Sequence, residues 1–167
     1  MMSLETEFLQ QIEKHKGVIF KISKMYMDNK NDQEDLFQEI IYQAWKSYPS
    51  FQGKSLFSTW LYRVALNTSI VFLRSDKKKI NTSDIELSTI NKRVENNDVE
   101  QQQLELMYKA IQQLGAIDKA LIFYYLENYS GKEIAAQMGI TEVNVRVKLN
   151  RAKQKLKTLI NELRTQQ

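Results

Sequence analysis

The stretch SGKEIAAQMGIT, residues 130–141, decides the fold of this chain. Ser130 and Glu133 have the spacing of a capping box, in which a Ser hydroxyl and a Glu carboxylate satisfy reciprocal backbone donors at a helix start. Gly139 can end that helix with a left-handed turn, and the following threonine can cap a second helix. Ala135 is small enough to let the two helices cross closely. The order predicts a helix-turn-helix, and a helical hairpin with no role in DNA binding is the alternative.

The helix predicted after residue 141 has an apolar face and a basic face. Its apolar stripe must pack inward and consists of Val145, Leu149, Ala152, Leu156, Leu159 and Leu163. From Arg146 to Lys157 there are six basic residues and no acid, a density suited to phosphate contacts along a DNA groove. Opposite the apolar stripe lie Val143, Val147 and Asn150, flanked by Asn144 and Arg146. We hypothesise that one of the two valines contacts a thymine methyl while Asn144 or Arg146 reads a base edge.

The composition of the chain favours an all-α protein. Of 167 residues, 43% are hydrophobic and 26% are charged, which is typical of a soluble globular protein. The chain has one Pro and five Gly, so long helices are more economical than a turn-rich sandwich or barrel. It has no Cys and one His, which excludes thiol nucleophiles and disulfides and leaves little room for metal clusters or His-based triads.

Targeting signals are not apparent in the sequence. No apolar run approaches the ~20 residues of a membrane span, and the amino terminus carries Glu5 and Glu7 instead of a basic and apolar leader. We therefore expect a cytoplasmic protein with no membrane insertion.

Charge divides the chain into three parts. Residues 1–79 carry net +3, residues 80–106 carry net −4, and residues 107–167 carry net +5. Residues 80–103 are rich in Asn, Ser, Thr and acids and show no sustained apolar period. We predict two small helical domains, 1–79 and 104–167, joined by a flexible acidic linker over 80–103. A polar loop inside a single bundle is the alternative, although such long loops are uncommon in a compact domain.

Residues 4–48 are predicted to form helices. A first helical pattern runs from Leu4 to Tyr26 and predicts either one helix or two helices interrupted near Gly17. Asn31 is a plausible N-cap for a second helix that ends before Pro49. The apolar residues of the second helix are Leu36, Phe37, Ile40, Ile41, Ala44 and Trp45.

A third helix, capped by Ser55 and running to about Lys79, has a packing side and a basic side. At 100° per residue, the packing side holds Leu61, Ala65, Thr68 and Phe72, with Val64 and Val71 at its edge. The basic stripe holds Arg63, Asn67, Arg74, Lys77 and Lys78. Trp60 and nearby aromatics are either core residues or platforms for unstacked bases.

In the carboxy-terminal half, a helix over residues 118–128 is expected to bury Leu121, Ile122, Tyr125 and Leu126.

Two sets of segments resemble one family. Residues 32–45, 51–53 and 57–67, with Arg74, resemble region 2 of bacterial RNA polymerase sigma factors. Residues 133–145 and 150–156 resemble region 4 of the same proteins, in the family's order and spacing. Because the chain has these two regions and a short linker, it resembles the extracytoplasmic-function (ECF) subgroup of the sigma-70 family.

The resemblance implies roles for particular residues. The segment with Asp35, Leu36, Gln38 and Glu39 matches the motif that docks on the coiled-coil clamp helices of the polymerase largest subunit. Trp60, Arg63 and Asn67 match the element that opens and reads the −10 region, and the basic stripe continues it with Arg74, Lys77 and Lys78. The loop over residues 48–56 matches the one that receives a flipped-out base.

The −35 assignment combines the resemblance with the two valines. Thr141, Asn144, Arg146, Lys148 and Arg151 match the helix laid in the −35 major groove, where we also place Val143 and Val147. Two features depart from the family: Val71 stands where Asp is frequent, and residues 115–117 replace a start that usually contains Pro.

The implied function is that of an alternative sigma factor, which binds core RNA polymerase and directs promoter-specific initiation. Its implied partners are core RNA polymerase, promoter DNA and, as for many family members, an anti-sigma factor. No catalysis, cofactor or metal is expected. The main alternative is a conventional helix-turn-helix regulator that binds duplex DNA without polymerase. A nuclease is disfavoured because the acids Glu34, Asp35 and Glu39 are not convincingly aimed at a cleft.

The linker length bears on how two DNA sites could be read together. About 24 residues reach at most ~80 Å when stretched and ~27 Å as a relaxed coil. Two DNA elements two helical turns apart are separated by roughly 70 Å. We therefore expect the free protein seldom to span both elements, so that a scaffold must hold its domains apart.

Overall fold

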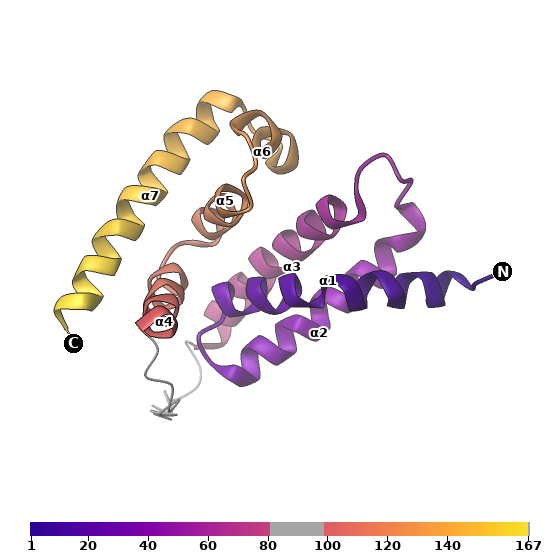
Figure 1. Cartoon of the computed structure of the whole chain (residues 1–167), viewed down its shortest axis with the longest axis horizontal. Helices are drawn as coiled ribbons and strands as arrows, with labels where there is room; N and C mark the ends of the chain where they lie inside the picture. Colours follow the sequence, from indigo (N-terminus) through magenta and orange to yellow (C-terminus); the bar gives the residue numbers. More distant parts are fainter. Residues whose placement is uncertain (81–98, 167) are drawn as a thin grey trace.

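The computed structural model describes residues 1–80 and 99–166, with side chains described for 1–75 and 99–166. Within these ranges the chain forms seven α-helices and one 3-10 turn, and no strand (Figure 1). The predicted all-α class is confirmed. Helices α1 (Leu4–Tyr26), α2 (Lys30–Ser47) and α3 (Phe57–Ile80) form an amino-terminal bundle, with the turn η1 (Tyr48–Ser50) after α2.

Two helix starts in the amino-terminal bundle differ from the predictions. Asn29, not Asn31, caps α2, and its side chain accepts a hydrogen bond from the Asp32 backbone N–H at 2.8 Å. Ser55 does not cap α3, because its hydroxyl donates to the Leu56 carbonyl and the helix begins at Phe57. Of the two alternatives for residues 4–26, a single helix is confirmed, since α1 runs unbroken from Leu4 to Tyr26 past Gly17.

The carboxy-terminal helices are α4 (Val99–Gln112), α5 (Ala116–Leu126), α6 (Gly131–Met138) and α7 (Glu142–Thr165). The capping box at the start of α6 is confirmed, with both reciprocal hydrogen bonds between Ser130 and Glu133 present. Gly139 ends α6 with φ +68°, and the Thr141 hydroxyl caps α7 by accepting from the Asn144 N–H at 3.1 Å. Helices α6 and α7 therefore form the predicted helix-turn-helix.

Two local predictions for the carboxy-terminal half are wrong. Helix α4 begins at Val99, so the last residues of the predicted linker are helical, while residues 81–98 lie outside the described structure. In α5, Tyr125 and Leu126 are exposed, whereas Phe123 and Tyr124 are fully buried. The reason is that α5 packs against α3 and α1 as well as α7, which buries a different side of the helix.

The two halves of the chain pack directly on one another, with α1 and α3 against α4 and α5 (Figure 1). Buried apolar residues from both halves form one continuous cluster. The Tyr26 hydroxyl donates to the Ala116 carbonyl at 2.7 Å, and the Lys21 ammonium pairs with the Glu127 carboxylate at 2.8 Å. Burial raises the pKa of Tyr26 well above its ordinary value, so this phenol stays protonated and can donate. Sequence patterning did not predict this contact between the domains.

A buried lysine completes the junction. The Lys119 side chain is almost fully buried, and its ammonium donates to the carbonyls of Gln112 at 2.9 Å and Leu114 at 2.6 Å. These carbonyls lie at the end of α4, where a helix favours positive charge. The same ammonium lies 5.7 Å from the centre of the Tyr26 ring in α1. Lys119 therefore joins the end of α4 to the amino-terminal bundle.

Candidate functional site

The outer face of α3 is a polar and basic stripe. Arg63, Asn67, Val71 and Arg74 are all exposed and recur at helical spacing. The opposite face buries Leu61, Ala65 and Ser69, and Leu66 is buried at the edge of the stripe. The prediction that Arg63, Asn67 and Arg74 share an exposed face is confirmed, and the side chains of Lys77 and Lys78 lie outside the described residues.

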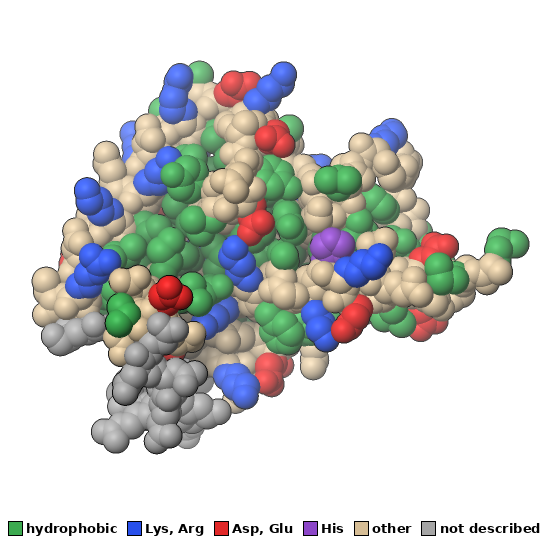
Figure 2. All heavy atoms as spheres, viewed as in Figure 1, with side chains coloured by type: hydrophobic (Ala, Val, Ile, Leu, Met, Phe, Trp, Pro, Cys, Tyr) green, Lys and Arg blue, Asp and Glu red, His purple; other side chains and the backbone are tan. Residues whose placement is uncertain are grey.

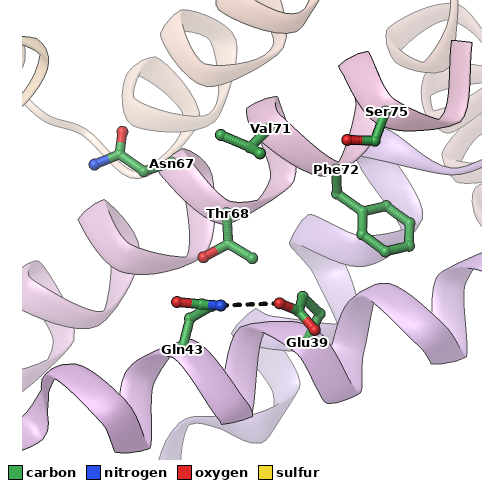
Figure 3. A pocket seen from close by; sticks show the side chains of 7 residues that line it. All are labelled: Glu39, Gln43, Asn67, Thr68, Val71, Phe72 and Ser75. Atoms are coloured by element: carbon green, nitrogen blue, oxygen red, sulfur yellow. Dashed lines mark hydrogen bonds between the residues drawn. The ribbon is translucent and has the colours of Figure 1, made fainter. Parts of the chain in front are cut away.

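A groove of about 400 Å³ runs between this stripe and α2 (Figure 3). Its lining residues are Glu39, Gln43, Asn67, Thr68, Val71, Phe72 and Ser75. The Gln43 amide donates to the Glu39 carboxylate at 2.9 Å across one turn of α2. The Phe72 ring points from α3 toward α2 (Figure 3). Glu39 therefore lies beside the α3 stripe.

Trp60 belongs to an aromatic cluster at the start of α3. Its ring centre lies 5.2 Å from that of Phe51, 5.4 Å from that of Phe57 and 6.1 Å from that of Tyr48. All four rings are partly exposed. The cluster ties the loop over residues 48–56 to the first turn of α3, so the rings pack on one another and still present edges to solvent.

The predicted docking residues of α2 differ in how far their side chains are exposed. Asp35 and Gln38 are exposed, and Glu39 is half-buried. Leu36 is fully buried and cannot contact a partner directly, which corrects its assignment as a docking residue. The physical reason is that Leu36, Ile40 and Ala44 recur every fourth residue and form the inner stripe of α2.

The outward face of α7 carries the predicted −35 residues. Arg146, Lys148 and Arg151 are exposed, as are Thr141 and Asn144. Val143 and Val147 are 57% and 41% exposed, so neither is a core residue. Val145, Ala152 and Leu156 are buried on the inner stripe, and Leu149, Leu159 and Leu163 are partly buried. Lys and Arg side chains follow the edge of the molecule that α7 forms (Figure 2).

Some residues have roles that the sequence did not indicate. The Lys153 ammonium lies 3.8 Å over the ring of Tyr125, so it packs on α5 instead of facing outward with its basic neighbours. Arg63 lies close enough to Tyr124 of α5 to oppose the rise that burial causes in the pKa of Tyr124. Tyr42 and Trp45 are exposed on α2, one and two turns beyond Gln38. Their spacing of four and seven residues from Gln38 could have identified them as members of the same exposed side of α2.

Two findings bear on other functions. Among the described residues, no three His, Cys, Asp or Glu side chains gather in a way that could hold a metal ion. None of the helices in the described ranges is long and apolar enough to cross a membrane.

Family models match both halves of the chain. A model described as Sigma-70 region 2 matches residues 11–79, and one described as Sigma-70, region 4 matches residues 104–156. The ECF RNA polymerase sigma factor SigM of Bacillus subtilis is 30% identical over 156 residues, which cover 86% of this chain and 95% of SigM. The ECF RNA polymerase sigma-E factor of Escherichia coli K12 is 28% identical over 79% of this chain and 75% of its own length.

Other matches are more local or structural. The ECF RNA polymerase sigma factor SigG of Mycobacterium tuberculosis is 45% identical over 49 residues, which span 13% of SigG. The fold is similar to that of the sigma factor RpoE of Bartonella quintana, solved in complex with the anti-sigma factor NepR. That similarity has a TM-score of 0.71 at 20% identity and covers 93% of this chain and 97% of RpoE. With both regions present in order and a relative matched along nearly its whole length, this chain belongs to the sigma-70 family of RNA polymerase sigma factors, in its ECF group.

Proposed function

We propose that this protein is an alternative sigma factor that binds core RNA polymerase and directs promoter-specific transcription initiation. The observation that carries the proposal is the joint presence of regions 2 and 4, in the order and spacing of a relative that is matched over 95% of its length. We divide the chain into a docking and −10 domain over 1–79, a linker region over 80–103 and a −35 domain over 104–167. Helix α4 begins inside the linker region, at Val99.

Docking on core polymerase is assigned to α2. Asp35 and Gln38 project from the solvent side of this helix, and Glu39 lies at its edge beside Gln43. Exposed carboxylate and amide groups on a helix held by an apolar inner stripe can meet basic groups of a partner without reorganising the bundle.

Opening and reading of the −10 element is assigned to α3 and the loop before it. Arg63 and Arg74 can neutralise phosphates, and Asn67 can donate to or accept from a base edge. Trp60 and its aromatic neighbours offer ring surfaces for unstacked bases, each worth ~1–3 kcal/mol. Lys77 and Lys78 extend the proposed basic stripe. Strand opening is then driven by capture of unstacked bases.

Recognition of the −35 element is assigned to α7. Its amino-terminal half projects Val143, Asn144 and Val147 between basic residues, which suits a helix lying in a major groove. Arg146, Lys148 and Arg151 supply phosphate or base contacts. The Thr141 hydroxyl is occupied as the N-cap of α7, so its part is to hold the helix start.

With its two halves packed together, the protein cannot bind the −10 and −35 elements at the same time. A folded chain of this length has a radius of gyration of roughly 15 Å, whereas promoter elements two turns apart are separated by roughly 70 Å. The contact of α1 and α3 with α4 and α5 must therefore open when both domains engage a promoter on polymerase.

The protein itself catalyses no reaction and uses no cofactor in this proposal, because the polymerase performs phosphoryl transfer. It acts in the cytoplasm, where polymerase and DNA are found. We include an anti-sigma factor among its partners, since the similar RpoE of Bartonella quintana was solved in complex with the anti-sigma factor NepR, and the similar CnrH in complex with the cytosolic domain of CnrY.

The proposal is tested by run-off transcription with purified core polymerase, with and without this protein. We expect promoter-dependent product only when the protein is present. The double substitution Asp35→Ala and Gln38→Ala should abolish this product while leaving the circular dichroism melt unchanged, because both side chains are exposed. Glu162→Ala, exposed near the end of α7, is the matched control and should retain activity. Sequence-specific duplex binding by the protein alone, with no effect on core polymerase, would instead establish a conventional regulator.

A further inference from the structure

The carboxyl end of α1 is completed by a side chain from the other half of the chain. An α-helix leaves its last four carbonyls without partners inside the helix. At the end of α1, the Gln112 amide donates to the Lys24 carbonyl at 2.8 Å and to the Met27 carbonyl at 3.3 Å. Gln112 is the last residue of α4, so the end of one domain caps a helix of the other.

Tyr26 makes a contact in the opposite direction. Its hydroxyl donates to the carbonyl of Ala116, the first residue of α5, at 2.7 Å. Tyr26 is only 2% exposed, so this hydrogen bond lies inside the contact between the two halves. The end of α1 is therefore joined to the corner between α4 and α5 by hydrogen bonds donated from both sides. We call the Tyr26 and Gln112 side chains the latch.

In the arrangement that the latch joins, α5 and the residues after it lie along one flank of α3. Near the start of α3, the Thr59 and Tyr129 hydroxyls are 3.1 Å apart, and the Tyr62 ring packs edge-on against Phe123 with ring centres 5.2 Å apart. Near the other end of α3, Arg74 lines a hollow of about 330 Å³ together with the first residues of α5. The contact therefore follows α3 for about four turns.

Both arginines of the α3 stripe lie at this flank. Arg63 is close enough to Tyr124 of α5 to oppose the rise that burial causes in the pKa of Tyr124. Arg74 shares its hollow with Asp118, an acidic residue in the first turn of α5. A carboxylate and a DNA phosphate attract the same guanidinium, so Asp118 competes with a strand for Arg74. A strand laid along α3 therefore meets α5 beside both arginines.

We propose that the latch holds the free protein in an autoinhibited form, in which its own α5 obstructs the binding of a single DNA strand along α3. The inference rests on the proposed function, because it concerns the surface assigned to the −10 element. Each hydrogen bond of the latch changes the ratio of closed to open protein by roughly 2- to 10-fold, since the separated groups pair with water instead. If only the open form binds a strand, the apparent affinity falls in proportion to the open fraction.

The test measures binding of the full-length protein, without polymerase, to a fluorescein-labelled single-stranded DNA of mixed sequence by fluorescence anisotropy. Tyr26→Phe keeps the ring and removes the hydrogen bond to α5, and Gln112→Ala removes the cap on α1. Each variant should bind the strand roughly 2- to 10-fold more tightly than wild type. Gln113→Ala changes the exposed glutamine next to the latch and is the matched control, with affinity unchanged.

The amino-terminal bundle keeps its own contacts in these variants. The Met27 carbonyl, for example, still accepts from the Gln33 amide at 2.8 Å when Gln112 is replaced. A circular dichroism melt of each variant checks that both halves remain folded, and Tyr26→Phe provides the test by itself if Gln112→Ala does not fold.

Further variants locate the gain in affinity on α3. Replacing both Arg63 and Arg74 by Ala should abolish the difference between Gln112→Ala and the parent protein, because the uncovered surface then lacks its cations. Arg146→Ala, on the outward face of α7, should weaken both proteins equally and leave the difference unchanged.

The outcomes separate this inference from the proposed function. Suppose that spin labels at Lys14→Cys and Glu162→Cys show that the domains of the latch variants have separated, while their affinity for the strand equals that of wild type. In that case α5 does not obstruct α3, and the inference is wrong. It is also wrong if neither the distance nor the affinity changes, or if the gain persists without the two α3 arginines. Promoter-dependent transcription with core polymerase is unaffected by these three results, so the proposed function then stands. Absence of that transcription overturns the proposed function instead, and with it the assignment of the obstructed surface to the −10 element.

Discussion

In the proposed function, single residues of α7 distinguish one promoter from another. Val143 and Val147 face solvent, where an aliphatic side chain gains nothing from packing within the chain. In a major groove the same side chains can contact a thymine methyl, a group that marks one base pair among four. In the proposed −35 contact, the neighbouring lysines contact phosphates, which every sequence presents equally.

We expect Val147→Ser to change the preferred base at one or two positions of the −35 element, because a hydroxyl replaces a methyl contact. The measurement is selection from a −35 library in transcription with core polymerase. Lys148→Ala is the matched change and should weaken activity about equally across the library, with a shallower dependence on salt. Uniform weakening by Val147→Ser would contradict its assignment to a base.

Glu133 is a residue whose charge has a consequence for stability. The Ser130 backbone N–H and side chain bond its carboxylate and lower the pKa of Glu133 below its ordinary value of 4.5. The folded state therefore binds fewer protons than the unfolded state, so this stabilisation is present above about pH 4.5 and is lost as pH falls through the lower folded-state pKa.

Glu133→Gln should therefore melt at a lower temperature than wild type at pH 7, and the difference should shrink as the pH falls below 4.5. Thermal melts followed by circular dichroism at several pH values measure it. Glu34→Gln, an exposed carboxylate of α2, serves as the control. A difference that stays constant down to pH 3 would show that the charge of Glu133 does not act through this cap.

At the scale of elements, the turn between α6 and α7 sets the direction of α7, the helix that we propose lies on DNA. Gly139 has φ +68°, a left-handed conformation that costs other residues roughly 1–2 kcal/mol. Space is not the constraint, since a Cβ built at this position meets no atom within 4 Å.

We expect Gly139→Ala to lower the free energy of unfolding by about 1–2 kcal/mol and Gly139→Asn by less, because Asn tolerates this conformation better. Urea denaturation provides the measurement. Gly131→Ala, in the first turn of the same helix and equally free of close neighbours, should cost nothing of that size. Equal losses for both alanine variants would contradict a conformational origin.

The elements that could be predicted from sequence are those determined by local rules. The capping box at Ser130, the outward basic face of α7 and the exposed stripe of α3 follow from spacing alone. The buried side of α5 could not be predicted, because Phe123 is covered by Tyr62 of the other half of the chain, with ring centres 5.2 Å apart. The α2 cap was misplaced because Asn29 and Asn31 both precede the apolar pattern, and local spacing does not distinguish them.

For the whole molecule, the relative position of the two domains decides whether a promoter can be read. The closed arrangement includes hydrogen bonds such as that from the Gln112 amide to the Lys24 carbonyl at 2.8 Å, the Lys21–Glu127 ion pair and shared apolar burial. Lys21 and Glu127 are each about one quarter to one third exposed, so their attraction is modest and weakens with salt. Binding energy from polymerase can therefore compete with these contacts.

We expect the domains to separate when core polymerase binds. The chain has no native Cys, so spin labels can be placed at Lys14→Cys in α1 and Glu162→Cys in α7, both exposed. Pulsed electron paramagnetic resonance should show one distance in the free protein and, with polymerase, a distance longer by on the order of 20 Å or more. The reason is that promoter elements two helical turns apart are separated by much more than the radius of the closed chain. A pair at Lys14→Cys and Asp28→Cys, within one domain, should not change. Transcription at the wild-type level by labelled protein whose long-range distance stays the same would show that both sites are used without opening.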